Sequence, residues 1–231
     1  MQPGQANELT HEQVSLARLP SAGRFLAYAT LYDLLSEAFA YPNAAFYTVL
    51  QNKDFPASLS GALGALPDAP ALSTAHAALQ AAVATTLIDC PLLQLESEYI
   101  ALFDANRELA TVHPYARLYG EQIVNPALLL QRLQAIYREQ GLMLDADNGA
   151  EQADHITVQL EFMALQFQRL AQTPEDAAVQ AEAKAFLLQL AWLPRFVTAL
   201  DDRGTPHWLY HPLAHLLAAL YASDPWAQAI E

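Results

Sequence analysis

The segment from Gly141 to Leu170 constrains the fold of this chain most, because a polar break is followed at once by a long amphipathic stretch. Gly141 and the run 145–149 interrupt regular structure. After them, apolar side chains recur at spacings of four and three residues, at Ile156, Leu160, Met163, Phe167 and Leu170. This is the period of one helix face, so the segment predicts a helix that buries one side against other elements.

Composition extends this prediction to the rest of the chain. Of the 231 residues, 53% are hydrophobic and 16% are charged, which is enough for a sizeable core in one large domain. Alanine, leucine and glutamine dominate, and no run alternates apolar and polar residues between turn signals as a strand would. We therefore expect an all-α fold, a single globular multi-helix bundle over 21–231 that follows a flexible N-terminal segment, 1–20.

Capping and turn residues divide the chain into helices of ordinary length. Helices are expected over 23–40, from 44, and over 72–88, 92–103, 126–141, 177–191, 194–200 and 207–221, besides the one that carries the stripe 156–170. Asn43 is the expected N-cap of the second helix, Asn125 precedes a helix-opening proline, and Thr173 is expected to cap the helix after it. The stretch 55–70, rich in Pro, Gly and Ala, predicts an irregular connection with at most one short turn. The polar stretch 141–154 is a candidate hinge, through which C-terminal helices would exchange between two copies.

Net charge and cysteine content restrict the classes of partner and the cell compartment that we expect. The formal net charge is −14 and the eleven basic residues are scattered, which argues against nucleic acid and for a basic or apolar partner, or simply for solubility. Cys90 is the only cysteine, so an internal disulfide and a cysteine-based zinc site are excluded. Residues 1–20 lack the apolar core of a secretory signal, and the longest apolar tract, 213–222, is too short to span a bilayer. We expect a soluble cytoplasmic protein without stable membrane insertion.

Three ionisable side chains, Glu151, Asp154 and His155, gather where the polar stretch enters the helix. A carboxylate there is stabilised by free N–H groups and by the positive end of the helix dipole, so Glu151 or Asp154 would serve as a cap. Capping does not require His155, nor Glu161, which lies seven residues beyond Asp154 and so on the same helical face. The cluster is therefore a candidate binding site as well as a candidate cap.

Catalytic and metal-binding motifs are weak in this chain. Glu8-x-x-His11 is the only Glu-x-x-His pair, whereas a di-iron bundle needs two such pairs and two further glutamates. His-Glu-x-x-His, P-loop, Gly-x-Gly-x-x-Gly and Gly-x-Ser-x-Gly sequences are absent. No catalytic residue, metal ligand or cofactor is assigned. A helical metal-dependent enzyme using Asp154, His155 and Glu161 stays as an alternative.

Three stretches resemble one known family. Residues 151–155 (Glu-Gln-Ala-Asp-His), with Leu-Glu-Phe-Met at 160–163, resemble the Glu-Pro-x-Asp-His signature and following stretch of the TorD/DmsD/NarJ family, with glutamine in place of proline. Residues 95–103, with Pro114-Tyr115 and Tyr119, resemble its Tyr-x-x-Leu-Phe … Pro-Tyr-x-x-x-Tyr segment, and 186–196 resemble its Phe-Leu … Trp-x-Pro-x-Phe. The matches span about 95–220.

The resemblance implies an all-helical cytoplasmic chaperone of molybdoenzyme maturation, and not an enzyme. Such a protein would bind the twin-arginine signal peptide and the apo catalytic subunit of a molybdenum-cofactor oxidoreductase, and would assist cofactor insertion before export. It would be a monomer or a swapped homodimer. The sequence is most similar to the delta-subunit-like branch that serves type II enzymes of the dimethyl-sulfoxide-reductase family. A structural subunit of the mature redox complex is the other alternative.

In this family the aromatic segments lie around a client groove near the Asp-His turn. An acidic and aromatic groove also suits a peptide whose guanidinium groups need carboxylates or aromatic faces and whose apolar part needs a trough. The expected client contacts are Glu151, Asp154, His155, Glu161, Tyr99, Phe103, Pro114, Tyr115 and Tyr119.

Overall fold

The computed structural model describes residues 22–104, 112–120, 125–143, 152–203 and 206–224, and the regular elements within these ranges are helical. The prediction of an all-α fold is confirmed. The α-helices are α2 (Ala22–Phe39), α3 (Ala44–Gln51), α4 (Asp54–Leu63), α5 (Pro70–Thr86), α6 (Leu92–Tyr99), α7 (Pro126–Glu139), α8 (Ile156–Gln172), α9 (Ala177–Leu187), α10 (Leu193–Asp201) and α11 (Tyr210–Ser223). Short turns of 3-10 helix are η1 (Leu87–Asp89), η3 (Ala116–Leu118) and η5 (Leu188–Leu190), and η2 (Ile100–Asp104) is a π-helical turn.

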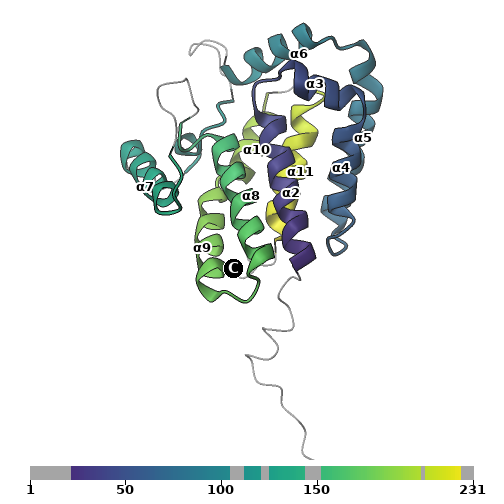
Figure 1. The fold of residues 1–231 in the computed structure, drawn as a ribbon. Coiled ribbons are helices and arrows are strands. Elements are labelled where there is room, and N and C mark those ends of the chain that lie inside the picture. The colour runs from purple at the N-terminus through teal and green to yellow at the C-terminus, as the bar shows by residue number, and fades with distance from the viewer. Residues whose placement is uncertain (1–21, 105–111, 121–124, 144–151, 204–205, 225–231) are drawn as a thin grey trace, which may run out of the picture.

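The helices form a bundle in which α2, α8 and α11 lie at the centre (Figure 1). Helix α2 packs against α8 and α4, α11 packs against α5 and α10, and α9 covers α8. Helices α3 and α6 cross one end of the bundle, and α7 lies beside it (Figure 1). The buried side chains of these helices form one hydrophobic core. Within the described ranges, no helix combines the length and hydrophobicity that crossing a bilayer requires.

The contact between α2 and α8 is built around an aromatic side chain from the predicted stripe. The Phe167 ring stacks on Tyr28 and Tyr32, with centroid distances of 5.0 and 5.6 Å, and lies 6.2 Å from the Phe25 ring. The whole stripe is buried, as its period predicts: Ile156, Leu160, Met163, Phe167 and Leu170. Helix α8 is thereby fixed along α2.

Local sequence signals predict some helix ends correctly. Asn43 accepts a hydrogen bond from the Phe46 amide, and Asn125 accepts one from the Ala127 amide, so both open helices as expected. Gly141 adopts a left-handed φ of 76°, the conformation that ends a helix at low cost in glycine.

Two predictions about local structure are wrong. Helix α4 occupies part of the stretch 55–70 that was expected to be irregular, because Pro56 lies in the first turn, where its missing N–H has no partner to lose. Phe55 and Leu59 then bury the inner face of α4. Helix α9 is capped by Asp176, which accepts from the amides of the second and third helical residues, and not by Thr173.

Other expectations lie outside the described residues. They are the flexible segment 1–20, Glu151, and residues 144–151 of the candidate hinge. The hinge and the exchange of helices between copies therefore stay predictions.

Replacing Phe167 by alanine should destabilise the protein by about 3–5 kcal/mol, because the change opens a cavity at the α2–α8 contact. Leu26→Ala provides the control: this α2 side chain is 56% exposed, and its loss should change the free energy of unfolding by less than about 0.5 kcal/mol. Urea unfolding of both variants measures the difference. Similar losses in the two variants would show that the aromatic contact does not dominate this seam.

Candidate functional site

The loop at 112–119 is fastened to the start of α8 by a short antiparallel bridge between Tyr115 and His155. The Ile156 amide donates to the carbonyl of the buried Pro114 at 2.8 Å, and the Ala116 amide donates to the Asp154 carbonyl at 3.0 Å. The structure therefore brings together four of the predicted site residues, Pro114, Tyr115, Asp154 and His155.

Asp154 is fully buried and is held by the chain's own arginine. Its Oδ1 lies 2.9 Å from Arg117 Nη1, and its Oδ2 accepts from the Arg117 amide at 3.1 Å. Burial raises the pKa of the Asp154 carboxyl, and the hydrogen bond and charge of Arg117 oppose this rise. The Arg117 guanidinium also lies 4.5 Å from the centroid of the Tyr115 ring and donates to the Gln152 side chain. The carboxylate and the aromatic face expected to receive a client arginine already contact an internal one.

His155, and not a carboxylate, caps α8. Its Nδ1 accepts from the Thr157 amide at 3.3 Å and lies 2.6 Å from the Thr157 hydroxyl. Because Nδ1 accepts, it carries no proton in this arrangement. Burial, reinforced by the charge of Arg117, lowers the pKa of His155 to about 4. The expectation that Asp154 caps the helix is wrong, since Asp154 precedes the cap and bonds to Arg117.

Tyr119 lies at the far end of the same loop and joins it to α10. Its ring stacks on Trp192 with a centroid distance of 5.5 Å, and its carbonyl accepts from Arg195 Nη1 at 2.9 Å. Burial raises the pKa of Tyr119 to about 12. Trp192 in turn donates to Gln159 of α8 at 2.8 Å, so the loop is fixed to both helices.

Tyr99 and Phe103 are core residues in this structure. They are 5% and 3% exposed, and their rings pack against each other and against Tyr210. The Tyr99 hydroxyl donates to the Phe39 carbonyl at 3.2 Å. Their client contact stays a prediction, and neither ring offers an open face here.

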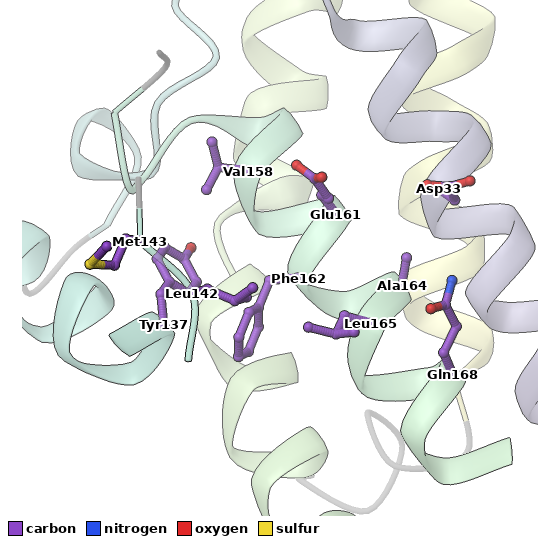
Figure 2. A pocket seen from close by; sticks show the side chains of 10 residues that line it. All are labelled: Asp33, Tyr137, Leu142, Met143, Val158, Glu161, Phe162, Ala164, Leu165 and Gln168. Carbon is purple, nitrogen blue, oxygen red and sulfur yellow. The ribbon is translucent and has the colours of Figure 1, made fainter. Parts of the chain in front are cut away.

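Glu161 lies apart from the Asp-His turn, in a pocket on the seam of α2 and α8 (Figure 2). Asp154 lies before the helix, so the two acids do not share a helical face as predicted. The pocket has a volume of about 350 Å³, and we call it the α2–α8 trough; its lining residues are Asp33, Tyr137, Leu142, Met143, Val158, Glu161, Phe162, Ala164, Leu165 and Gln168.

The α2–α8 trough combines an apolar floor with two acidic side chains. Glu161 and Asp33 extend from neighbouring helices, while Val158, Phe162 and Leu165 supply apolar surface between α8 and the end of α7 (Figure 2). Both carboxylates are exposed, and neither has a hydrogen-bond or ion-pair partner within the described ranges. Such a trough can accept a ligand that carries cations beside an apolar segment.

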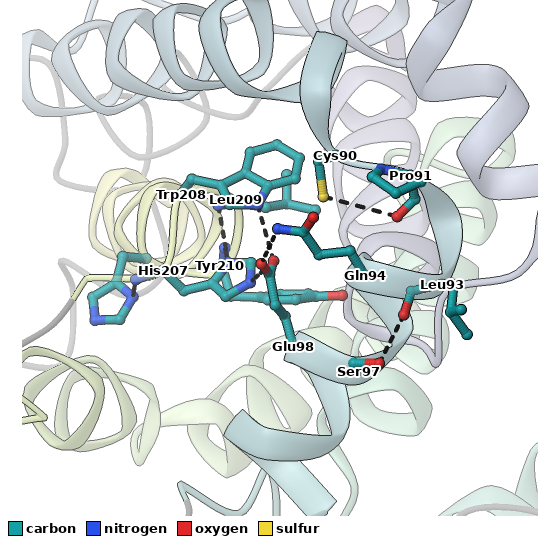
Figure 3. Close-up of polar contacts among 11 residues, drawn as sticks. Cys90, Pro91, Leu93, Gln94, Ser97, Glu98, His207, Trp208, Leu209 and Tyr210 are labelled. Atoms are coloured by element: carbon teal, nitrogen blue, oxygen red, sulfur yellow. Dashed lines mark hydrogen bonds and ion pairs between the residues drawn. The ribbon is translucent and has the colours of Figure 1, made fainter.

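A polar cluster between α6 and the start of α11 was not predicted from sequence (Figure 3). Glu98 Oε2 accepts from His207 Nε2 at 3.0 Å and from Trp208 Nε1 at 3.2 Å, while its Oε1 accepts from Gln94 at 2.8 Å. His207 Nδ1 accepts from the amides of residues 209 and 210. Burial lowers the pKa of His207, and Glu98 opposes that shift. Glu98 directly precedes Tyr99 in the stretch 95–103 that resembles the family. This acid is the sequence signal from which the cluster could have been found. The cluster ties α6 to the start of α11.

The residues named for a metal-dependent enzyme are not assembled into a metal site. Asp154 pairs with Arg117, His155 caps α8, and Glu161 lies in the α2–α8 trough. Across the described part of the chain, no group of three or more His, Cys, Asp or Glu side chains is placed to hold a metal ion. In the described ranges, Asp154, His155 and Glu161 therefore do not form one metal site.

The imidazole cap makes stability depend on pH. The unfolded chain protonates His155 near pH 6.5, but the folded chain does so only near pH 4. The free energy of unfolding should therefore fall as the pH drops through this window, by up to about 3 kcal/mol from this residue. His155→Asn keeps a capping oxygen and does not titrate. In urea unfolding between pH 4 and 6.5, the free energy of unfolding of this variant should therefore depend less on pH than that of the wild type.

The raised pKa of Asp154 acts in the opposite sense, because protonation of a buried carboxyl is easier in the folded state. Asp154 is present in both proteins, so the difference between their pH profiles isolates the imidazole. Parallel profiles for wild type and His155→Asn would contradict the capping role.

Arg117→Ala should cost about 3–5 kcal/mol of stability, because it leaves the buried Asp154 carboxylate unpaired. Arg169→Ala is the matched control: Arg169 pairs with Glu182 at 3.0 Å on the surface, and such a pair contributes about 0–1 kcal/mol. Asp154→Asn added to Arg117→Ala should restore part of the loss, since no charge is then buried. Thermal and urea unfolding decide the point, and equal costs for the two arginines would refute it.

Comparison with known proteins identifies the family. The sequence model of the family described as nitrate reductase delta subunit matches residues 67–198, which is more than half of the chain. A search of curated proteins finds no match. The matched range contains the 112–119 loop, the Asp-His turn, α8 and the Trp192 segment. This chain therefore belongs to the nitrate reductase delta subunit family, the NarJ/TorD-like family of molybdoenzyme-maturation chaperones.

Proposed function

We propose that this protein is a cytoplasmic chaperone that binds the twin-arginine signal peptide and the apo catalytic subunit of a molybdenum-cofactor oxidoreductase. It assists cofactor insertion and assembly before the client is exported. Membership of the family supports the chaperone role. The observation that carries the binding site is the α2–α8 trough, where two carboxylates that have no partner within the described ranges lie beside apolar surface.

The trough matches the chemistry of such a peptide. Each guanidinium offers up to five N–H donors and forms charge-assisted hydrogen bonds with a carboxylate. Asp33 and Glu161 provide one carboxylate each from adjacent helices, and the apolar part of the peptide would pack on Val158, Phe162 and Leu165. The net charge of −14 favours approach of a basic segment.

The Asp-His turn has a different part in this proposal. Asp154 and the face of Tyr115 are occupied by Arg117, so a client arginine would have to displace an internal one there. At Asp33 and Glu161 it would displace no side chain of the described ranges. The turn therefore acts as scaffold, which fixes the position of α8 and with it Glu161.

The work proposed needs differential affinity for the immature client and no bond-breaking chemistry. A chaperone that binds the signal peptide delays export until the cofactor is inserted. It then dissociates, because its affinity for the mature client is lower. The client is assigned to the type II branch of the dimethyl-sulfoxide-reductase family, and the chaperone is a monomer or a swapped homodimer. Co-expression with candidate catalytic subunits identifies the client by its cofactor content.

Replacing both trough carboxylates, Asp33→Asn with Glu161→Gln, should weaken a synthetic twin-arginine signal peptide by about tenfold or more, because two charge-assisted contacts are lost. Titration calorimetry measures the affinity. Substituting glutamine for both arginines of the peptide should weaken binding to the wild type by a similar factor and should add little in the double variant.

The matched control is Glu175→Gln with Asp202→Asn. These side chains are exposed outside the trough, and the change removes the same number of charges. If both double variants weakened binding equally, the effect would come from the overall charge of the protein and not from contacts in the trough. Two outcomes would favour the other classes: bound metal in the purified protein supports an enzyme, and stoichiometric retention in the purified mature complex supports a structural subunit.

A further inference from the structure

The sulfur atoms of this chain differ sharply in their access to solvent. Met163 is fully buried in α8, and Cys90 is 2% exposed, with burial raising the pKa of its thiol. Met143 is 87% exposed. A thioether reacts with peroxide only where the oxidant can reach it, and a thiol reacts through its thiolate. Within the described ranges, Met143 is therefore the sulfur that a dissolved oxidant meets first.

Met143 also lies at a functional position. It lines the α2–α8 trough beside Leu142 and Tyr137, across from Phe162 of α8 (Figure 2). Leu142 is held in place because its amide donates to the Tyr137 carbonyl at 2.9 Å, and the Tyr137 hydroxyl donates to the Ala153 carbonyl at 2.8 Å. The flexible, polarisable side chain of Met143 thus adds apolar surface to the rim of a trough whose other walls are fixed.

We propose that Met143 is an oxidation site at which hydrogen peroxide lowers the affinity of the α2–α8 trough for apolar ligand segments. A lone pair of the sulfur attacks one peroxide oxygen, an S–O bond forms, and the O–O bond breaks. The sulfur is oxidised by two electrons to the sulfoxide, and the other oxygen leaves as water after proton transfer. Methionine sulfoxide reductases reverse this step, so the modification is of the reversible kind that a switch requires.

The consequence for binding follows from polarity. The sulfoxide carries a strong acceptor, and an apolar segment packed against Met143 would bury that acceptor without a donor. In the reduced state the same contact is favourable on both sides. The inference rests on the proposed function for the identity of the ligand, because the apolar part of the client peptide is the segment that would contact this rim.

The test treats the full-length protein with limiting hydrogen peroxide and maps oxidation by peptide mass spectrometry. Met143 should be oxidised well before Met163 and Cys90. The affinities of two probes are then measured before and after treatment: the twin-arginine signal peptide, and the neutral apolar dye N-phenyl-1-naphthylamine. Oxidation should weaken both by about fivefold or more, the lower range for burying an unpaired polar group.

Met143→Leu is the control, since it keeps apolar surface and cannot be oxidised. Its probe affinities should resemble those of the reduced wild type and should not respond to peroxide, and methionine sulfoxide reductase should restore the wild type. Oxidation of Met163 or Cys90 first, or unchanged affinity for both probes in oxidised wild type, overturns the inference. A peptide that fails to bind even the reduced protein counts against the proposed function, and the dye then decides the inference alone.

Discussion

The ion pair between Arg117 and Asp154 is the contact on which the organisation of this protein depends. A fully buried carboxylate is tolerated because a guanidinium and a backbone amide of the same residue satisfy its two oxygens. The pair closes the bridge between the 112–119 loop and the start of α8. Helix α8 is also packed along α2 through Phe167. Together with that packing, the ion pair determines the position of α8 and hence of its acidic and apolar surface residues. The most distinctive polar residues of the sequence therefore build the frame, and the open acidic surface lies elsewhere.

Two helices of the bundle begin in the same unusual way, with an imidazole as the acceptor for the first amides. His155 does this as the N-cap of α8, and His207 does it from two residues before Leu209, the N-cap of α11. Each ring nitrogen must be unprotonated to accept, and burial lowers the pKa of both rings. A carboxylate serves as a cap at any pH above its own pKa. An imidazole accepts the amide hydrogen bonds only while it is unprotonated, so this cap is lost when the pH falls below the pKa of the ring. The polar ends of both helices are in turn tied to distant elements, through Tyr115 for His155 and through Glu98 for His207.

The sequence predicts what depends on neighbours in the chain. The apolar period of α8 and the caps Asn43 and Asn125 are short-range features and are confirmed. Helix α4 is missed because Pro56 and Gly61 are breakers on average, although a proline in the first turn costs nothing. The partner of Asp154 lies 37 residues away, and Asp33 and Glu161 meet only through the packing of α2 on α8. No local pattern predicts such pairings, so Asp154 and Glu161 were recognised without their surroundings, and Asp33 was missed.

The placement of the two trough carboxylates, which have no partner in the part of the chain that the structure describes, has a physical logic. Asp33 and Glu161 project from the two helices that are packed most tightly, so the backbone on which they stand does not have to be ordered when a ligand binds. Two like charges on one seam of a protein with a net charge of −14 repel each other. The folded state bears this repulsion because the side chains remain in water. A ligand that brings two cations relieves the repulsion and gains two charge-assisted contacts, whereas a ligand that brings only an apolar segment leaves it in place. In the proposed function, the trough would therefore bind adjacent cations joined to an apolar stretch more tightly than either feature alone, which is the discrimination that a chaperone for one client requires.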